Sequence, residues 1–291
     1  MCPDIRRERR DLFDAASEIL GWNLDAMIAE GPDDVLTETQ HAQPALYATS
    51  YALWFEFAAL VDGGPVAFAG HSLGEYTALA AAGVLSYEDG CALVAERGLA
   101  MAAAGADDAS GMAALLGADQ ATAEGIAEQR TAEGGALYVA NINAPGQIVV
   151  AGGSEDIAWL AENARDLGVR RAVPLNVSAG FHSPFMTDAR QRLGAALAEV
   201  EFHDADTSVF ANATASVTHD PKATLDEQLT APVRFAETLE NMAAAGVDTF
   251  VHVGPGDVTA GLAKRTVKDA AVMTVSSLVD ARNVADALSV Q

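Results

Sequence analysis

Apolar residues along the chain recur with two different periods, and this alternation predicts a mixed α/β protein. Residues 11–24 and 43–60 carry apolar side chains at helical spacing, and Pro44 fits the first turn of the second helix. After a glycine-rich turn, the apolar run at 66–69 is typical of a short buried strand. The alanine-rich stretch that follows predicts a helix that ends near Gly83.

A different pattern begins near residue 110, where short strands and helices follow one another. The order is strand, helix, strand, strand, helix, strand, at residues 111–117, 119–130, 136–142, 147–153, 155–168 and 170–177. This order is that of a ferredoxin-like unit, which is a sheet with two helices on one face. We therefore expect a small domain inserted into a larger one.

The last third of the chain returns to an alternation of helices and strands. Helices are predicted at 188–202, 234–246 and 259–267, and strands at 208–214, 249–254 and 271–277. Such alternation favours an α/β domain with a largely parallel sheet. The expected organisation is a large domain in two parts, 1–107 and 178–291, separated by the small domain at 108–177.

One joint between a predicted strand and a predicted helix carries chemistry. Residues 70–74 read Gly-His-Ser-Leu-Gly and fit the G-x-S-x-G pattern. In such a joint a nucleophilic hydroxyl, here that of Ser72, projects from a sharp turn that flanking glycines allow. The backbone N–H of Leu73 then faces a developing oxyanion at the positive end of the helix. The alternative interpretation is a serine that only caps the helix.

The residues around this joint go further than the pattern. The segment GHSLGEYTALAAAGVL resembles the nucleophile segment of the malonyl-CoA:acyl carrier protein transacylases and related acyltransferase domains. Other segments resemble motifs of the same family, in family order: HAQPALYATSYAL, NINAPGQIVVAGG, SAGFHSPFM, QLTAPVRF and HVGPGDVTAGLAKR. Several matching segments in the same order are far more specific evidence than a single G-x-S-x-G joint.

The resemblance implies an α/β-hydrolase-like large domain with a mostly parallel sheet and an inserted ferredoxin-like small domain. It also implies transfer of a malonyl group from malonyl-CoA to the phosphopantetheine thiol of an acyl carrier protein. A malonyl-serine intermediate and ping-pong kinetics would follow. The product would serve fatty acid or polyketide-type synthesis, and no metal or redox cofactor is implied.

The resemblance assigns roles to individual residues. His182 would be the general base for Ser72, with a backbone carbonyl near Gln228 holding its tautomer, so that the pair is a dyad rather than a triad. Arg97 would bind the free carboxylate of the malonyl group through two parallel hydrogen bonds. Phe181 would shorten the pocket beside the α-carbon and oppose a methyl branch.

Each assignment has a structural alternative. His182 is compatible with a satisfied histidine near a helix start, Phe181 with a core position, and Arg97 with a solvated surface position. A role for the Gln228 side chain stays open. We expect His71 to pack or orient beside the nucleophile, and the remaining histidines to be structural or at the surface: His41, His203, His219 and His252.

Charge and cysteine content narrow the choice of partners and compartment. The chain has 41 acidic and 17 basic residues and a formal net charge of −24, which argues against nucleic acid and anionic membranes as partners. The acidic residues are spread along the chain, as in proteins adapted to high salt.

Cys2, at a terminus we expect to be frayed, and Cys91 suggest neither a disulfide framework nor a metal site. The charged start does not resemble a secretory signal. We expect a cytoplasmic monomer.

The sequence departs from the family pattern near its start. The family begins with a strand and a G-Q-G-S-Q-like loop that supplies a second oxyanion donor, and residues 1–291 contain no such segment. One donor is worth about 10²–10³ in rate, and the strand would pair backbone groups of the main sheet. We favour a true start upstream of Met1. The other interpretations are a different segment in that place, or a weakened or non-catalytic relative.

A serine esterase or thioesterase is the rival enzyme. It shares the elbow, and its triad would run Ser, Asp, His, so His252 would be its late histidine. Arg97 and the inserted small domain favour the transferase. The reaction product distinguishes the two classes of enzyme, because a transferase passes the acyl group to a thiol and an esterase or thioesterase releases it to water.

Overall fold

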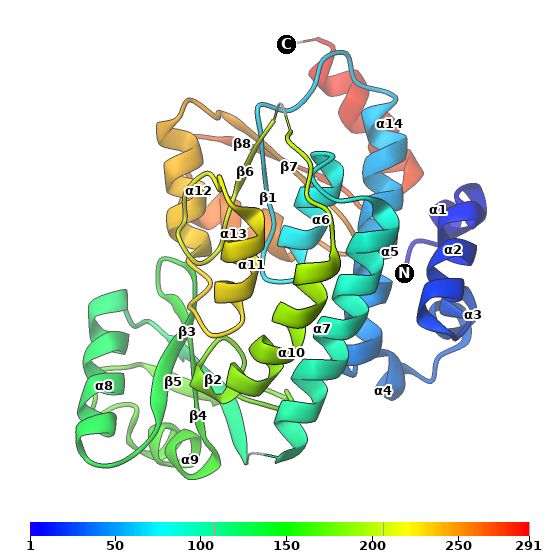
Figure 1. The fold of residues 1–291 in the computed structure, drawn as a ribbon. Coiled ribbons are helices and arrows are strands. Elements are labelled where there is room, and N and C mark those ends of the chain that lie inside the picture. The colour runs from blue at the N-terminus through cyan, green and yellow to red at the C-terminus, as the bar shows by residue number, and fades with distance from the viewer. Residues whose placement is uncertain (108, 206, 291) are drawn as a thin grey trace.

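Two groups of strands organise the structure, and helices cover them (Figure 1). The computed structural model describes residues 1–107, 109–205 and 207–290. One group is a four-stranded sheet, which lies with helices α8 and α9 at one end of the molecule. The other group consists of two parallel strand pairs, and long helices separate it from the N-terminal helices.

The four-stranded sheet has the predicted ferredoxin-like order. Its elements are β2 (Ser110–Leu116), α8 (Gln120–Ala132), β3 (Leu137–Ala144), β4 (Gln147–Gly153), α9 (Ser154–Asn163) and β5 (Arg171–Pro174). The strands lie in the order β3-β4-β2-β5, and every pairing is antiparallel. Asp119 caps α8 by accepting a hydrogen bond from the Thr122 N–H.

Alternation along β4 gives this sheet two buried faces. Ile148 and Val150 belong to the apolar cluster that includes residues of α8 and α9. Val149 and Ala151 point the other way, into a cluster against which Phe181 packs. The second face therefore rests on the segment that carries the predicted base, and this contact joins the small sheet to the rest of the molecule.

The strands of the large domain form parallel pairs, as the alternating pattern predicts. β1 (Ala67–Ala69) pairs with β6 (Ser208–Phe210), and β7 (Thr249–Val253) pairs with β8 (Ala271–Val275). A cavity of about 910 Å³ lies between β1 and β7 and is lined by residues of both. The prediction that β1 is a buried strand is wrong: its three residues are half-buried, because within the described residues it pairs on one side only.

Two long helices, α5 (Thr39–Ala58) and α7 (Tyr87–Asp107), pack closely against each other. A Cβ on Gly98 would lie 2.8 Å from the Cα of Gln40, so the two backbones approach to a distance that only glycine allows. α5 begins earlier than predicted, and Pro44 therefore lies inside the helix and not in its first turn. The neighbouring helices are α6 (Gly74–Ala81), η1 (Pro184–Met186) and α10 (Thr187–Glu199).

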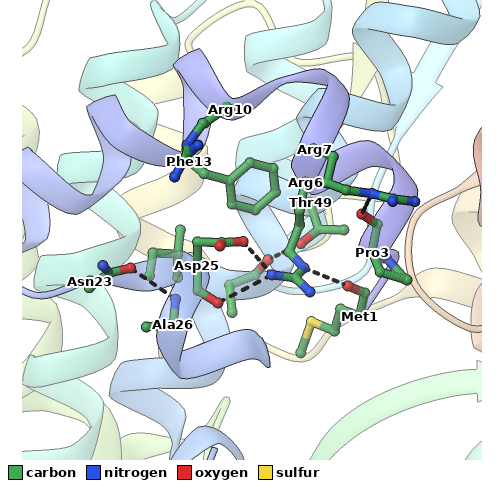
Figure 2. A network of polar contacts seen from close by, with 12 residues as sticks. Met1, Pro3, Arg6, Arg7, Arg10, Phe13, Asn23, Asp25, Ala26 and Thr49 are labelled. Atoms are coloured by element: carbon green, nitrogen blue, oxygen red, sulfur yellow. Dashed lines mark hydrogen bonds and ion pairs between the residues drawn. The ribbon is translucent and has the colours of Figure 1, made fainter. Parts of the chain in front are cut away.

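The N-terminal segment is anchored, and the expectation of a frayed end is wrong. Ile5 is fully buried, and the Cys2 thiol donates to the Ser276 carbonyl at 2.9 Å. Figure 2 shows Arg6 reaching both the Met1 carbonyl and the Asp25 side chain. The helices here are α1 (Pro3–Glu8), α2 (Arg10–Leu20), α3 (Leu24–Glu30) and α4 (Asp33–Leu36).

The remaining helices complete the C-terminal part: α11 (Pro221–Gln228), α12 (Phe235–Ala244), α13 (Val258–Thr266) and α14 (Leu278–Leu288). Among the described helices, none has the length and apolarity needed to cross a bilayer. The predicted domain boundaries stay a prediction, and the first of them falls at residue 108, which lies outside the described residues.

The close approach of α5 and α7 predicts an unusual response to alanine. Gly98→Ala will lower the free energy of unfolding by about 1–3 kcal/mol, because the added Cβ meets backbone atoms and the helices must separate. Gly125→Ala in α8 is the matched control, since a Cβ there has no neighbour within 4 Å. The control will gain about 0.5–1 kcal/mol from helix propensity. Urea unfolding measures both, and equal gains would contradict the packing argument.

Candidate active site

The turn between β1 and α6 holds Ser72 in the left-handed region, with φ of 52°. A Cβ on Gly70 would lie 2.0 Å from the carbonyl carbon and oxygen of Gly74, so this position accepts only glycine. The Ser72 N–H donates to Asn212 Oδ1 at 2.6 Å, and its carbonyl accepts from Gln228 Nε2 at 3.1 Å. The sharp elbow that the sequence predicts is therefore present and is held from two sides.

The Ser72 hydroxyl is hydrogen-bonded to His182, and the tautomer of this histidine follows from its other contact. Ser72 Oγ and His182 Nε2 are 2.7 Å apart, and His182 Nδ1 lies 2.9 Å from the Gln228 carbonyl oxygen. A carbonyl only accepts, so Nδ1 carries the proton and Nε2 accepts from the serine hydroxyl. A backbone carbonyl thus occupies the place that a carboxylate holds in a triad.

Burial keeps the imidazole of His182 neutral. The residue is 4% exposed, and this burial, reinforced by the positive charge of Arg97, lowers its pKa to about 3. A neutral imidazole with a free Nε2 can accept the proton of a serine hydroxyl. The arrangement is that of a nucleophile with its base.

Arg97 lies in the middle of α7 and reaches the same hydroxyl. It is 1% exposed, so the alternative of a solvated surface arginine is wrong. Its NH1 donates to Gln43 Oε1 at 2.7 Å, and its NH2 donates to Ser72 Oγ and to Gln228 Oε1, each at 3.0 Å. Burial lowers the pKa of the guanidinium from its ordinary value. A buried fork of N–H donors beside a nucleophile is suited to a planar carboxylate.

Three polar residues around this centre were not predicted. Gln43 accepts a hydrogen bond from Arg97, and Asn212 accepts one from the Ser72 N–H. Glu75, on α6, is fully buried. Glu75 Oε2 accepts from Gln228 Nε2 at 2.7 Å and from the Asn212 N–H at 2.9 Å. Burial raises the pKa of Glu75 to about 7. The sequence signal that could have identified Glu75 is a carboxylate in the apolar helix directly after the turn that carries Ser72.

The Gln228 side chain, whose role the sequence left open, joins these groups. Its amide oxygen accepts from Arg97, and its amide nitrogen donates to Glu75 and to the Ser72 carbonyl. Its own carbonyl accepts from His182. Gln228, at the end of α11, therefore forms hydrogen bonds with Ser72, Glu75, Arg97 and His182.

His71 connects the elbow to the small domain. Its Nε2 lies 2.7 Å from Asn143 Oδ1 on β3, and its ring packs edge-on against Phe235 with centroids 5.2 Å apart. Phe181, immediately before His182, is half-buried and packs against both the small sheet and the large core. These contacts place both residues beside the centre, and the specificity role of Phe181 stays a prediction.

The other predicted participants lie apart from the dyad or stay untested. His252, the late histidine of the rival hydrolase, contacts Thr259 and the Gly254 carbonyl, whereas the histidine bonded to Ser72 is His182. The Leu73 N–H directly precedes α6, and its oxyanion role stays a prediction. Within the described residues, no group of three His, Cys, Asp or Glu side chains is placed to hold a metal ion.

This fold and this geometry have counterparts among known proteins. The family model described as the acyl transferase domain matches residues 9–290. The chain belongs to the acyl transferase domain family. Its relatives include the malonyl CoA-acyl carrier protein transacylase of Bacillus subtilis, 41% identical over 270 residues that cover 91% of this chain and 84% of that protein. The enzyme of the same name from Escherichia coli K12 is 36% identical over 281 residues, which are 96% of this chain and 90% of that protein.

Solved structures agree with the predicted fold class. The malonyl CoA-acyl carrier protein transacylase of Coxiella burnetii superposes with a TM-score of 0.91 at 31% identity, covering 98% of this chain and 89% of that one. A malonyl-transacylase solved with a type II polyketide acyl carrier protein superposes with a TM-score of 0.92 at 31% identity, covering 98% and 94%. The large α/β domain with an inserted ferredoxin-like unit is thereby confirmed.

The environment of His182 predicts its titration. Burial, reinforced by the positive charge of Arg97, lowers its pKa to about 3, so the imidazole stays neutral as the pH falls from 8 to 5. Histidine ring NMR signals followed over this range will show no titration of His182, identified by its loss in His182→Gln. A histidine model peptide in the same buffer, with the ordinary pKa of about 6.5, serves as the control. A His182 midpoint near 6.5 would contradict the assignment.

Proposed function

We propose that this chain transfers a malonyl group from malonyl-CoA to the phosphopantetheine thiol of an acyl carrier protein, through a malonyl ester of Ser72. The observation that carries the proposal is the position of one hydroxyl between two groups. Ser72 Oγ lies 2.7 Å from the base nitrogen of His182 and 3.0 Å from the guanidinium of Arg97. The proposed base and the proposed carboxylate-binding group therefore both contact the hydroxyl of the proposed nucleophile. The relatives named above are malonyl CoA-acyl carrier protein transacylases.

In the first half-reaction, Ser72 Oγ attacks the thioester carbonyl and its proton passes to His182 Nε2. The Gln228 carbonyl, bonded to Nδ1 at 2.9 Å, stabilises the imidazolium that forms. The Leu73 N–H stabilises the oxyanion. The carbon–sulfur bond then breaks, the coenzyme A sulfur takes the proton from His182, and a malonyl-serine ester remains.

The second half-reaction reverses these roles on a new thiol. The phosphopantetheine thiol gives its proton to His182 and its sulfur attacks the ester carbonyl. The carbon–oxygen bond breaks, and His182 returns the proton to Ser72 Oγ. No step requires a metal or a redox cofactor, and the kinetics are ping-pong.

Arg97 selects the acyl group in both half-reactions. In the free site its NH2 is bonded to Ser72 and Gln228, so a malonyl carboxylate can replace these neutral acceptors by a charged one. A carboxylate can accept two parallel hydrogen bonds from the planar guanidinium and brings an opposite charge, which neither neutral oxygen does. An acetyl group offers no carboxylate, and its transfer is therefore disfavoured.

The remaining proposals follow from charge and sequence. The net charge of −24 disfavours nucleic acid and anionic membranes as partners, and the protein partner is the acyl carrier protein. We propose that the enzyme acts as a monomer in the cytoplasm, in fatty acid or polyketide-type synthesis.

Intact mass after brief incubation tests the nucleophile and the carboxylate binder together. The native chain will gain a malonyl adduct from malonyl-CoA and little adduct from acetyl-CoA, and Ser72→Ala will gain neither. Arg97→Ala will lose about 10²–10³-fold in malonylation rate, because a buried charge partner is removed, and will discriminate less against acetyl-CoA.

Each other outcome of this assay has a definite meaning. Equal loading of acetyl and malonyl groups by the native chain would refute the role of Arg97. Release of coenzyme A without an adduct would identify a thioesterase. Neither adduct nor release would support the interpretation of a weakened relative.

Phe181 is expected to set the preference against a methyl branch. Phe181→Leu will raise the ratio of methylmalonyl to malonyl loading by about 10-fold, because one methyl group in a pocket is worth about 1–3 kcal/mol. Phe185→Leu, a half-buried aromatic of the same segment that packs against Tyr138, is the matched control and will leave the ratio unchanged. Competition between the two thioesters, read by mass, measures it, and an unchanged ratio in Phe181→Leu would assign Phe181 to packing alone.

A further inference from the structure

Among the described residues, some buried charged side chains are hydrogen-bonded to an opposite charge and others only to neutral groups. Asp156 is 7% exposed and forms an ion pair with Arg130 at 2.7 Å. Glu75 is fully buried, yet the two donors that bond its carboxylate are neutral amides. Arg97 likewise bonds neutral oxygens. Buried charges normally have an opposite charge nearby, so Glu75 and Arg97 call for an explanation together.

The Gln228 amide connects the two charges. Its Oε1 accepts from Arg97 at 3.0 Å, and its Nε2 donates to Glu75 at 2.7 Å. The negative end of the amide dipole thus faces the guanidinium, and the positive end faces the carboxylate. The charge of Arg97 in turn lowers the pKa of Glu75, against the larger effect of burial. In the free site, Glu75 is the counter-charge of Arg97, one amide away.

The Glu75 carboxylate can accept a proton without losing a hydrogen bond. Both of its hydrogen bonds end on Oε2, and Oε1 is buried without a partner among the described residues. A proton on Oε1 therefore leaves the contacts to Gln228 and to the Asn212 N–H in place. The two hydrogen bonds at Oε2 are therefore compatible with both the ionised and the neutral carboxyl group.

The tyrosine and the two histidines near this centre do not change charge around neutral pH. Tyr76, next in the same helix, has a raised pKa and is neutral, and burial lowers the pKa values of His71 and His182 so that both are neutral. Asp226, on α11 beside Gln228, is paired with Arg190 at 2.7 Å. The charge balance of the centre therefore rests on Arg97 and Glu75.

We propose that Glu75 is a proton-accepting counter-charge of the malonyl site, ionised when the site is empty and protonated at Oε1 when a substrate carboxylate binds Arg97. This inference rests on the proposed function. An arriving carboxylate would otherwise leave two buried negative charges against one positive charge, which disfavours ionisation of one of them. One proton from solvent neutralises Glu75, and no other bond forms or breaks.

The proposal gives malonylation a pH dependence with a definite sign. Above pH 7 the free enzyme must take up a proton to load malonyl, so the second-order rate constant of malonylation falls by up to about tenfold per pH unit. In Glu75→Gln the amide oxygen replaces Oε2 as acceptor, and the NH2 group stands where the protonated oxygen would be. This variant mimics the neutral form, and its rate constant loses this dependence on pH.

The decisive measurement is proton uptake during malonylation. The native enzyme and malonyl-CoA are mixed at pH 7.5 in weak buffer with a pH indicator, and malonyl-serine is counted by mass in the same sample. With a Glu75 pKa of about 7, about three quarters of a proton will be taken up per malonyl-serine formed. Glu75→Gln will take up close to none. Glu96→Gln is the matched control, because Glu96 is a neighbour of Arg97 in α7 whose carboxylate pairs outward with Arg192, and it will behave as the native enzyme.

The outcomes separate this inference from the proposed function. Malonyl-serine that forms without proton uptake in the native enzyme would overturn the role of Glu75 and leave the transferase intact. Absence of malonyl-serine would overturn the transferase itself. Uptake that persists in Glu75→Gln would assign the proton to another group and would also refute the inference. If Glu75→Gln does not fold, the native measurement still tests the proposal, because malonyl-serine that forms without proton uptake refutes it.

Discussion

The centre of this molecule is organised by the cost of keeping one guanidinium out of water. Arg97 lies in the middle of α7, which packs closely on α5 at Gly98. Its NH1 and NH2 groups donate to oxygens of Gln43, Ser72 and Gln228, whereas its Nε is buried without a partner among the described residues. Removing such a charge from water is costly, and the hydrogen bonds of NH1 and NH2 offset part of that cost. The positive charge then acts on its neighbours, since it helps to hold His182 neutral and helps Glu75 to ionise. Charge balance at the centre and, in the proposed function, the preference for a carboxylate are therefore consequences of one burial. The pKa of His182, lowered mainly by its own burial, is lowered further by the same positive charge.

Strain at the centre is stabilised by hydrogen bonds from distant parts of the chain. Ser72 and His182 both have positive φ, 52° and 56°, which is costly for residues other than glycine. Asn212 and Gln228 hold the backbone of Ser72, and the Gln228 carbonyl holds the ring of His182. These partners lie between 46 and 156 positions from the groups that they hold. The elbow is stable because the loop after β6 and the end of α11 close over it.

The sequence was informative where one segment decides its own structure. Alternation and helical spacing were enough for the small domain, where β2, β3 and β4 place residues in the clusters on both faces of the sheet and Asp119 caps a helix. The elbow was predictable because Gly70 meets Gly74 only four positions away. Gln43, Glu75 and Asn212 were missed because their partners lie across long separations that a local pattern does not report. The half-buried state of β1 and the anchoring of Cys2 were missed for the same reason, since each depends on what lies beside it.

The one-sided pairing of β1 sets how the nucleophile is protected against local opening. Within the described residues β1 is paired with β6 alone and borders a cavity on its other side. Its amides are therefore protected from exchange by hydrogen bonds to one neighbouring strand only. Arg97, by contrast, belongs to a long helix packed on α5 and α10, which is the kind of element that opens only with the whole domain. Arg97 thus belongs to a helix that packs on several others, and Ser72 follows a strand with one paired neighbour. We therefore expect the amides of β1 to exchange with solvent at a lower opening free energy than those of α7.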